Sequence, residues 1–178
     1  VTDLSDREYN KIRMQMGLVF QGGALFDSMN VEENVAFVLN EFMDLDHKTV
    51  QKRVTDSLAM VGLQNVEKMM TSELSESMKK RVSLARILCM EPQIILYDEP
   101  TTGVDPITAD AINNLIVELS HKLKVTSIVV THDMTSAYKI ADSMVMLYHG
   151  QVIAEGTSSE IKNTKHPVVK QFITGEAE

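Results

Sequence analysis

Two neighbouring carboxylates end an apolar run in the middle of the chain. The run is "IILYDEP", residues 94–100, and its carboxylates are Asp98 and Glu99. Such a run predicts a buried strand, and open α/β sheets bind their ligands at the carboxyl ends of the strands. In sites that cleave phosphate bonds, one carboxylate holds Mg²⁺ and a second polarises the attacking water. Asp98 and Glu99 are candidates for these two roles; the alternative is a solvated turn.

Two further polar side chains follow predicted strands. His132 comes after the apolar run "SIVVT", and Gln21 comes after "GLVF". A histidine in this position can donate a hydrogen bond to a phosphate group and orient a water molecule. A glutamine amide can reach a metal ion or a water molecule. The alternative for each residue is an ordinary structural role in a loop, on the surface or in the core.

The stretch "LSESMKKRVSLARIL", residues 74–88, predicts a helix that begins at Ser75. The unpaired N–H groups and the dipole of a helix start can bind an anion, and the hydroxyls of Ser75 and Ser77 add hydrogen-bond donors. The alternative is a surface helix capped by Ser75. Glu76 favours that alternative, because a carboxylate in the first turn suits the dipole and stands four residues before Lys80.

The rest of the chain supplies the elements that position these residues. Predicted helices cover 5–14, 30–43, 47–62, 75–90, 106–123 and 133–141, with a short last helix from 157, and predicted strands cover 16–20, 93–98, 126–131, 143–148 and 151–156. This alternation predicts an α/β fold with a mostly parallel sheet, helices on both faces and a C-terminal hairpin. Residues 30–72 are predicted to be helical throughout, as a subdomain inserted between α/β core segments 1–29 and 73–178.

The composition restricts the class of protein. The chain has 178 residues and a net charge of −8, which argues against nucleic acid as the main partner. A single cysteine, Cys89, rules out an internal disulfide framework and a cysteine metal cluster. We expect no membrane span, because every apolar run is shorter than the roughly 18 residues that a span needs.

The order and spacing of these stretches resemble those of the ATP-binding-cassette (ABC) ATPases, the nucleotide-binding subunits of ABC transporters. "LSESM" at 74–78 matches the signature loop, "ILYDEP" at 95–100 the Walker B strand, "TTGVDP" at 101–106 the D-loop and "THD" at 131–133 the switch histidine. The resemblance covers nearly the whole chain. As a set the motifs are highly specific, although no single one is.

The resemblance implies a role for each candidate residue, with ATP and Mg²⁺ as the cofactors. Glu99 would be the general base and His132 the switch that contacts the γ-phosphate. Asp98 would bind Mg²⁺ through water, and Gln21 would sense the metal and the water. Asp105, in the D-loop, would lie at an interface between two ATPase subunits.

Two ATPase subunits of this family pack head to tail, so each signature helix faces the ATP of its partner. Ser75, Glu76 and Ser77 would therefore serve the partner's ATP. The family usually has glycine at the positions of Glu76 and Ser77. A carboxylate at position 76 adds bulk and negative charge beside a phosphate, so we expect Glu76 to weaken the ATP-bound dimer unless its side chain turns outward.

A narrower resemblance is to the ATPases of MCE (mammalian cell entry) transporters of the maintenance-of-lipid-asymmetry type. It lies in the methionine that ends the signature, in "DEPTTGVDPITADAINNLI" and in the tail "HPVVKQFITGEAE". It implies transport of phospholipid, a cytoplasmic location and peripheral attachment to the inner membrane through a permease. The permease would contact residues 21–45, with Phe26, Met29 and Phe42 as candidates.

The sequence contains no P-loop, G-x-x-x-x-G-K-[S/T], which ABC ATPases use to wrap phosphates. In the family this motif precedes the glutamine loop, so we expect the 178 residues to be one incomplete ABC ATPase domain and to be inactive by themselves. The alternative is a catalytically silent interaction or regulatory module of ABC form. A soluble ABC ATPase of the DNA-repair kind would need a long coiled-coil insertion, which the sequence lacks.

Overall fold

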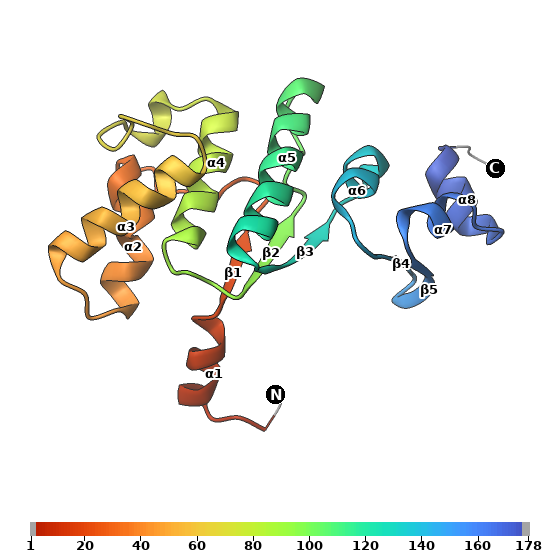
Figure 1. Cartoon of the computed structure of the whole chain (residues 1–178), viewed down its shortest axis with the longest axis horizontal. Coiled ribbons are helices and arrows are strands. Elements are labelled where there is room, and N and C mark those ends of the chain that lie inside the picture. The colour runs from red at the N-terminus through yellow and green to blue at the C-terminus, as the bar shows by residue number, and fades with distance from the viewer. Residues whose placement is uncertain (1–2, 176–178) are drawn as a thin grey trace. The chain divides into compact units, whose positions relative to one another are not determined.

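The computed structural model describes residues 3–175, which divide into two compact units between Val130 and Thr131 (Figure 1). The first unit contains α1 (Asp6–Arg13), β1 (Met16–Val19), α2 (Val31–Phe42), α3 (His47–Met60), the 3₁₀ helix η1 (Thr71–Glu73), α4 (Glu76–Leu88), β2 (Ile94–Asp98), α5 (Pro106–Leu123) and β3 (Thr126–Val130). The second contains α6 (Met134–Ile140), β4 (Met144–Tyr148), β5 (Gln151–Gly156), α7 (Ser158–Lys162) and α8 (Pro167–Thr174). The predicted α/β class and its main helices and strands are confirmed.

Local signals account for the helix starts. Asn30 caps α2 through a reciprocal pair of bonds: its side-chain oxygen accepts from the Glu33 N–H at 2.9 Å, and Glu33 Oε2 accepts from the Asn30 N–H at 2.9 Å. The same arrangement joins Thr157 and Glu160 at the start of α7. These contacts satisfy N–H groups that have no partner within the helix, which is why the S/T/N-x-x-E pattern predicts helix starts.

The first unit is built on a parallel sheet with the strand order β1-β2-β3. Val19 of β1 lies opposite Tyr97 of β2, and Asp98 of β2 lies opposite Val130 of β3. Because the strands are parallel and in register, their carboxyl ends meet at one edge. The segments that follow β1 and β2 therefore begin side by side.

Helices α4 and α5 cover one face of this sheet. Val19, Ile95 and Tyr97 are buried on that face, and a Cβ on Gly17 would lie 1.9 Å from Ile87 of α4, so the helix packs directly against β1. The opposite face carries Leu18 and Ile128, which are 38% and 53% exposed. The prediction of helices on both faces is therefore met on one face only within residues 3–130.

The region 30–72 is less helical than its sequence predicts. α2 and α3 pack against α4, but residues 61–70 form turns and extended chain. Gly62 adopts φ 71° and ends α3, and Asn65 adopts φ 58°. The segment then runs back beside the start of α2, where the Val31 N–H donates to the Met69 carbonyl at 3.0 Å. The prediction that residues 30–72 are helical throughout is therefore wrong for residues 61–70, because left-handed residues stop a helix whatever its apolar pattern.

The second unit holds the predicted hairpin. β4 and β5 are antiparallel, and the turn residues His149 and Gly150 adopt φ 47° and 75°, as a two-residue hairpin turn requires. Helix α8 was not predicted, although Pro167 at its first position is a recognisable start signal. The division of the chain into two units after residue 130 was not predicted either. The boundaries proposed for the helical subdomain remain predictions.

Candidate functional site

The carboxyl edge of the sheet brings together three of the predicted site residues. Asp98 is the last residue of β2, Glu99 follows it, and Gln21 lies two residues beyond the end of the neighbouring strand β1. Gln21 and Asp98 are exposed, and Glu99 is partly buried. The parallel register therefore brings the Gln21 amide to the same sheet edge as two carboxylates that lie 77 and 78 positions later in the sequence.

Glu99 has an unusual backbone conformation. Its φ is 48°, in the left-handed region, which costs a residue other than glycine about 1 kcal/mol or more. Its N–H donates to the Val130 carbonyl at 2.9 Å, and its Oε2 accepts from the Thr102 hydroxyl at 3.1 Å. The chain thus turns sharply out of β2 while the carboxylate is held at the sheet edge. Strain of this kind is concentrated at functional sites.

The donor set at this edge fits Mg²⁺. Magnesium prefers hard oxygen ligands and is commonly held by one or two carboxylates together with phosphate oxygens. Asp98 and the Gln21 amide supply such oxygens. In the part of the chain that the structure describes, no group of three or more His, Cys, Asp or Glu residues could enclose a metal ion.

Two further predicted site residues are His132 and Asp105. His132 follows β3 by two residues and belongs to the second unit, where it is exposed. Asp105 is the N-cap of α5: its carboxylate accepts from the N–H groups of Ile107 and Thr108, each at 3.0 Å, and from the Thr108 hydroxyl at 2.6 Å. The hydrogen bonds from Thr108 lower the pKa of Asp105. The carboxylate of Asp105 is thus bonded to its own helix.

The start of α4 presents the remaining candidates. Ser75 is the N-cap, and its hydroxyl oxygen accepts from the Met78 N–H at 3.2 Å. Glu76 is exposed and pairs with Lys79, whose Nζ lies 2.8 Å from Glu76 Oε1. That hydrogen bond lowers the pKa of the Glu76 carboxyl. The charge of Lys80 also lowers the pKa of the Glu76 carboxyl, although less than Lys79 does, while the Lys80 Nζ donates a hydrogen bond to the Gln21 carbonyl at 3.0 Å.

Two buried polar residues, Arg86 and Asn34, hold the segment that follows Gln21, and neither was predicted from the sequence. The Arg86 guanidinium donates to the carbonyls of Gly23 and Ala24. The Asn34 amide bonds both the N–H and the carbonyl of Phe26. Each is a polar residue in a largely apolar run, "SLARIL" and "NVAFVL". A polar side chain in such a run needs hydrogen-bond partners if it is buried, and that contrast was the signal in the sequence.

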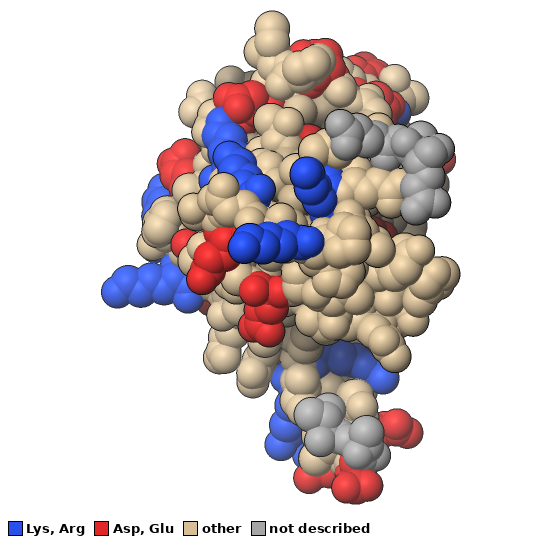
Figure 2. All heavy atoms as spheres, turned by 90° about the vertical axis from the view of Figure 1, so that its right-hand side faces the viewer, with Lys and Arg blue, Asp and Glu red and all other residues tan. Residues whose placement is uncertain are grey.

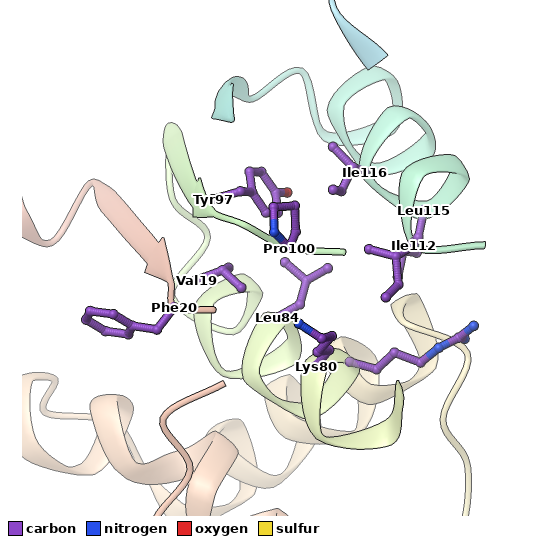
Figure 3. Close-up of a pocket in the computed structure, with 10 residues that line it drawn as sticks. Val19, Phe20, Lys80, Leu84, Tyr97, Pro100, Ile112, Leu115 and Ile116 are labelled. Carbon is purple, nitrogen blue, oxygen red and sulfur yellow. The ribbon is translucent and has the colours of Figure 1, made fainter. Parts of the chain in front are cut away.

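A small, mostly apolar pocket lies behind this edge, between the sheet and helices α4 and α5 (Figure 3). Tyr97 and Pro100 line it from the β2 end, and Ile112 and Ile116 from α5. Lys80 lies at its α4 side. Burial raises the pKa of the Tyr97 hydroxyl to about 12, so Tyr97 remains neutral. Tyr97 and Pro100, which line the pocket, directly flank Asp98 and Glu99 in the chain.

The surface carries charges of both signs. Figure 2 shows lysine and arginine side chains interspersed with aspartate and glutamate on the face it displays. Phe26 and Phe42, two of the residues expected to meet a permease, are 40% and 67% exposed, and Met29 is half-buried. Across the described residues, each helix is either too short or too polar for a membrane crossing.

The parallel sheet with Asp98 and Glu99 at its carboxyl edge, followed by a sharp turn and a capped helix, defines a nucleotide-binding domain of the ABC type. A family model described as "ABC transporter" matches residues 1–102, and the chain belongs to that family.

Known proteins agree with this class. The intermembrane phospholipid transport system ATP-binding protein MlaF of Haemophilus influenzae is 41% identical over 98% of this chain and 66% of its own length. Among solved structures, cbiO1 of Clostridium perfringens, part of the ABC transporter complex cbiONQ, matches with a TM-score of 0.84 and 32% identity over 96% of this chain and 68% of its own. The dimeric cassette MJ0796, in a post-hydrolysis state with ADP and Pi, matches with a TM-score of 0.75 and 31% identity over 88% of this chain and 68% of its own. The chain thus spans just under two thirds of the MlaF relative.

Proposed function

We propose that this chain is part of an ATP-hydrolysing subunit of an ABC transporter. The observation that carries the proposal is the geometry of the sheet edge, where Asp98 ends β2 and Glu99 is held in a left-handed turn beside the Gln21 segment. A carboxylate that can accept a proton, next to a carboxylate that can hold Mg²⁺, suits the hydrolysis of a phosphoanhydride.

The proposed roles follow from chemistry. A bound Mg²⁺ neutralises phosphate charge, and Asp98 would hold it through water with Gln21 as a further oxygen donor. Glu99 accepts a proton from the attacking water, and its bond from the Thr102 hydroxyl orients the carboxylate. His132 donates a hydrogen bond to the γ-phosphate and so reports whether the terminal phosphate is present.

The partners of the full-length gene product are proposed by similarity. MJ0796 was solved as a dimer, and we infer that this chain also pairs head to tail with a second ATPase subunit. Ser75, Ser77 and the first N–H groups of α4 would then bind the partner's ATP, and Asp105 would lie at the dimer interface. A permease would dock near residues 21–45, where Phe26 and Phe42 are exposed, and would hold the subunit at the cytoplasmic side of the membrane.

The transported substrate is proposed to be phospholipid. Its support is the identity of 41% to a MlaF protein over nearly all of this chain. ABC form by itself does not define the transported molecule, since one fold hosts many functions.

The test is Mg²⁺-dependent ATP hydrolysis by the full-length gene product that contains this chain. We expect hydrolysis that requires Mg²⁺, and we expect Asp98→Asn to raise the Mg²⁺ concentration for half-maximal activity by about tenfold, because a charged ligand becomes neutral. Asp110→Asn, an exposed change on α5, is the control. Hydrolysis that is equally fast in excess chelator, or absent under all conditions, would contradict the proposal.

Glu76→Gly is expected to increase ATP turnover of the full-length gene product by roughly threefold or more, because it removes negative charge beside the partner's γ-phosphate. Pairing with Lys79 offsets only part of that charge, since both side chains are partly solvated. The steady-state rate at saturating ATP is the measurement. The control is Glu73→Gly, just before α4. An unchanged rate in Glu76→Gly would show that the carboxylate points away from the phosphate.

The second candidate function is a catalytically silent ABC module. Two observations favour it: the 178 residues contain no G-x-x-x-x-G-K-[S/T], and Glu76 replaces a signature glycine. A full-length gene product that has this motif and binds ATP with micromolar affinity would support the enzyme. A gene product that lacks the motif and binds no ATP would support the silent module.

A further inference from the structure

Helix α4 holds the segment after Gln21 through a buried cation. Arg86 is 6% exposed, and its Nη1 and Nη2 donate to the carbonyls of Ala24 and Gly23 at 2.8 and 3.0 Å. Its Cζ also lies 5.9 Å from the centre of the Phe26 ring. Among the ion pairs found in residues 3–175, none joins Arg86 to an acid. The charge is therefore satisfied mainly by backbone carbonyls of this one segment.

The backbone conformation of Gly23 and Ala24 directs their carbonyls toward Arg86. Gly23 and Ala24 adopt φ 75° and 45°, two left-handed residues in succession. Gly23 also lies close to α4, since a Cβ there would come within 3.5 Å of the Lys79 carbonyl. The two carbonyls thus converge on the planar guanidinium, whose fork of N–H groups fits two acceptors at once. A lysine ammonium is a point charge and lacks that fork.

A second cation of α4 reaches Gln21 itself. The Lys80 Nζ donates to the Gln21 carbonyl at 3.0 Å. From the other side, the buried Asn34 of α2 bonds the N–H and carbonyl of Phe26 at 2.8 and 3.1 Å. Side chains of α2 and α4 thereby hold residues 21–26 through hydrogen bonds.

We propose that Arg86 and Lys80 are positioning residues that join Gln21 to the start of α4, so that segment and helix move as one body. The inference rests on the proposed function, in which Gln21 serves the ATP of its own subunit and Ser75 serves the ATP of the partner. Ser75 and Arg86 are 11 positions apart along one helix, a span of about 16 Å. A rigid connection of this kind couples the two ATP sites of a dimer.

Cooperativity of ATP hydrolysis in the full-length gene product tests the coupling. We expect the wild type to have a Hill coefficient above 1 for ATP, because two linked sites can approach about 2. Arg86→Met and Lys80→Met are expected to lower it to about 1, and Arg86→Met to lower the rate by roughly tenfold. Arg86→Lys should recover part of the cooperativity, because its ammonium reaches one carbonyl. Hydrogen exchange of the backbone amides of residues 21–26 should be faster in Arg86→Met and Lys80→Met than in the wild type, and intermediate in Arg86→Lys.

The control is Arg81→Met on the same helix, because the Arg81 Nη1 donates to the Val61 carbonyl at 2.9 Å, away from the Gln21 segment. We expect this variant to remain cooperative. Lys80→Met tests the coupling independently in case Arg86→Met fails to fold, because Lys80 is only partly buried. A wild type that hydrolyses ATP cooperatively, with Arg86→Met and Lys80→Met equally cooperative, would overturn the coupling and leave the proposed function intact. A wild type without ATPase activity would overturn the proposed function and the coupling with it.

Discussion

Glu99→Gln is expected to slow ATP hydrolysis by the full-length gene product by about a hundredfold or more, with ATP binding retained. Glutamine keeps the shape of the side chain and can still bond to Thr102, which donates to Glu99 Oε2 at 3.1 Å. It cannot accept a proton from the attacking water. The loss therefore falls on the chemical step, while residues that contact the nucleotide remain in place.

Single-turnover hydrolysis and equilibrium ATP binding, measured separately, check this prediction. Because ATP would persist in the site, Glu99→Gln should also increase the fraction of dimer at saturating ATP. The matched control is Glu118→Gln, an exposed carboxylate on α5, which should retain the wild-type rate. A Glu99→Gln variant that turns over within about threefold of wild type would remove Glu99 from the role of general base.

Asn34→Ala is expected to lower the free energy of unfolding by about 3 kcal/mol. The side chain is fully buried, and its amide nitrogen donates to the carbonyls of Phe26, Met29 and Asn30 at 3.0–3.1 Å while its oxygen accepts from the Phe26 N–H at 2.8 Å. Alanine removes these bonds at once and leaves backbone groups without partners. Buried polar groups that lose their partners are costly because water cannot replace them.

Urea unfolding at constant temperature measures this effect, with Asn40→Ala as the control on the exposed side of the same helix. The control should change the unfolding free energy by less than about 0.5 kcal/mol. Equal stability of Asn34→Ala and wild type would mean that the contacts of Asn34 contribute nothing net. Alanine favours a helix more than asparagine does, so loss of stability in both variants would mean that the effect is not specific to the contacts of Asn34.

The sequence by itself determined the elements and the chemistry of the sheet edge. Apolar runs of strand length end at Asp98 and Val130, and capping residues such as Asn30, Ser75 and Asp105 start helices where predicted. These signals are local: a cap bonds within three residues, and a strand's apolar side chains follow one another. The order of the motifs then indicated the ABC class, which the family match confirmed.

Only the tertiary structure decided how the elements are joined. Arg86 bonds carbonyls 62 and 63 positions earlier, and Lys80 bonds a carbonyl 59 positions earlier. Sequence spacing could not reveal these partners, because a backbone carbonyl is present at every residue and only the fold selects which one meets the cation. For the same reason, Glu76 pairs with Lys79 while Lys80 turns to Gln21. Local pattern specified which residues can do chemistry, and long-range packing specified which segments hold them in position.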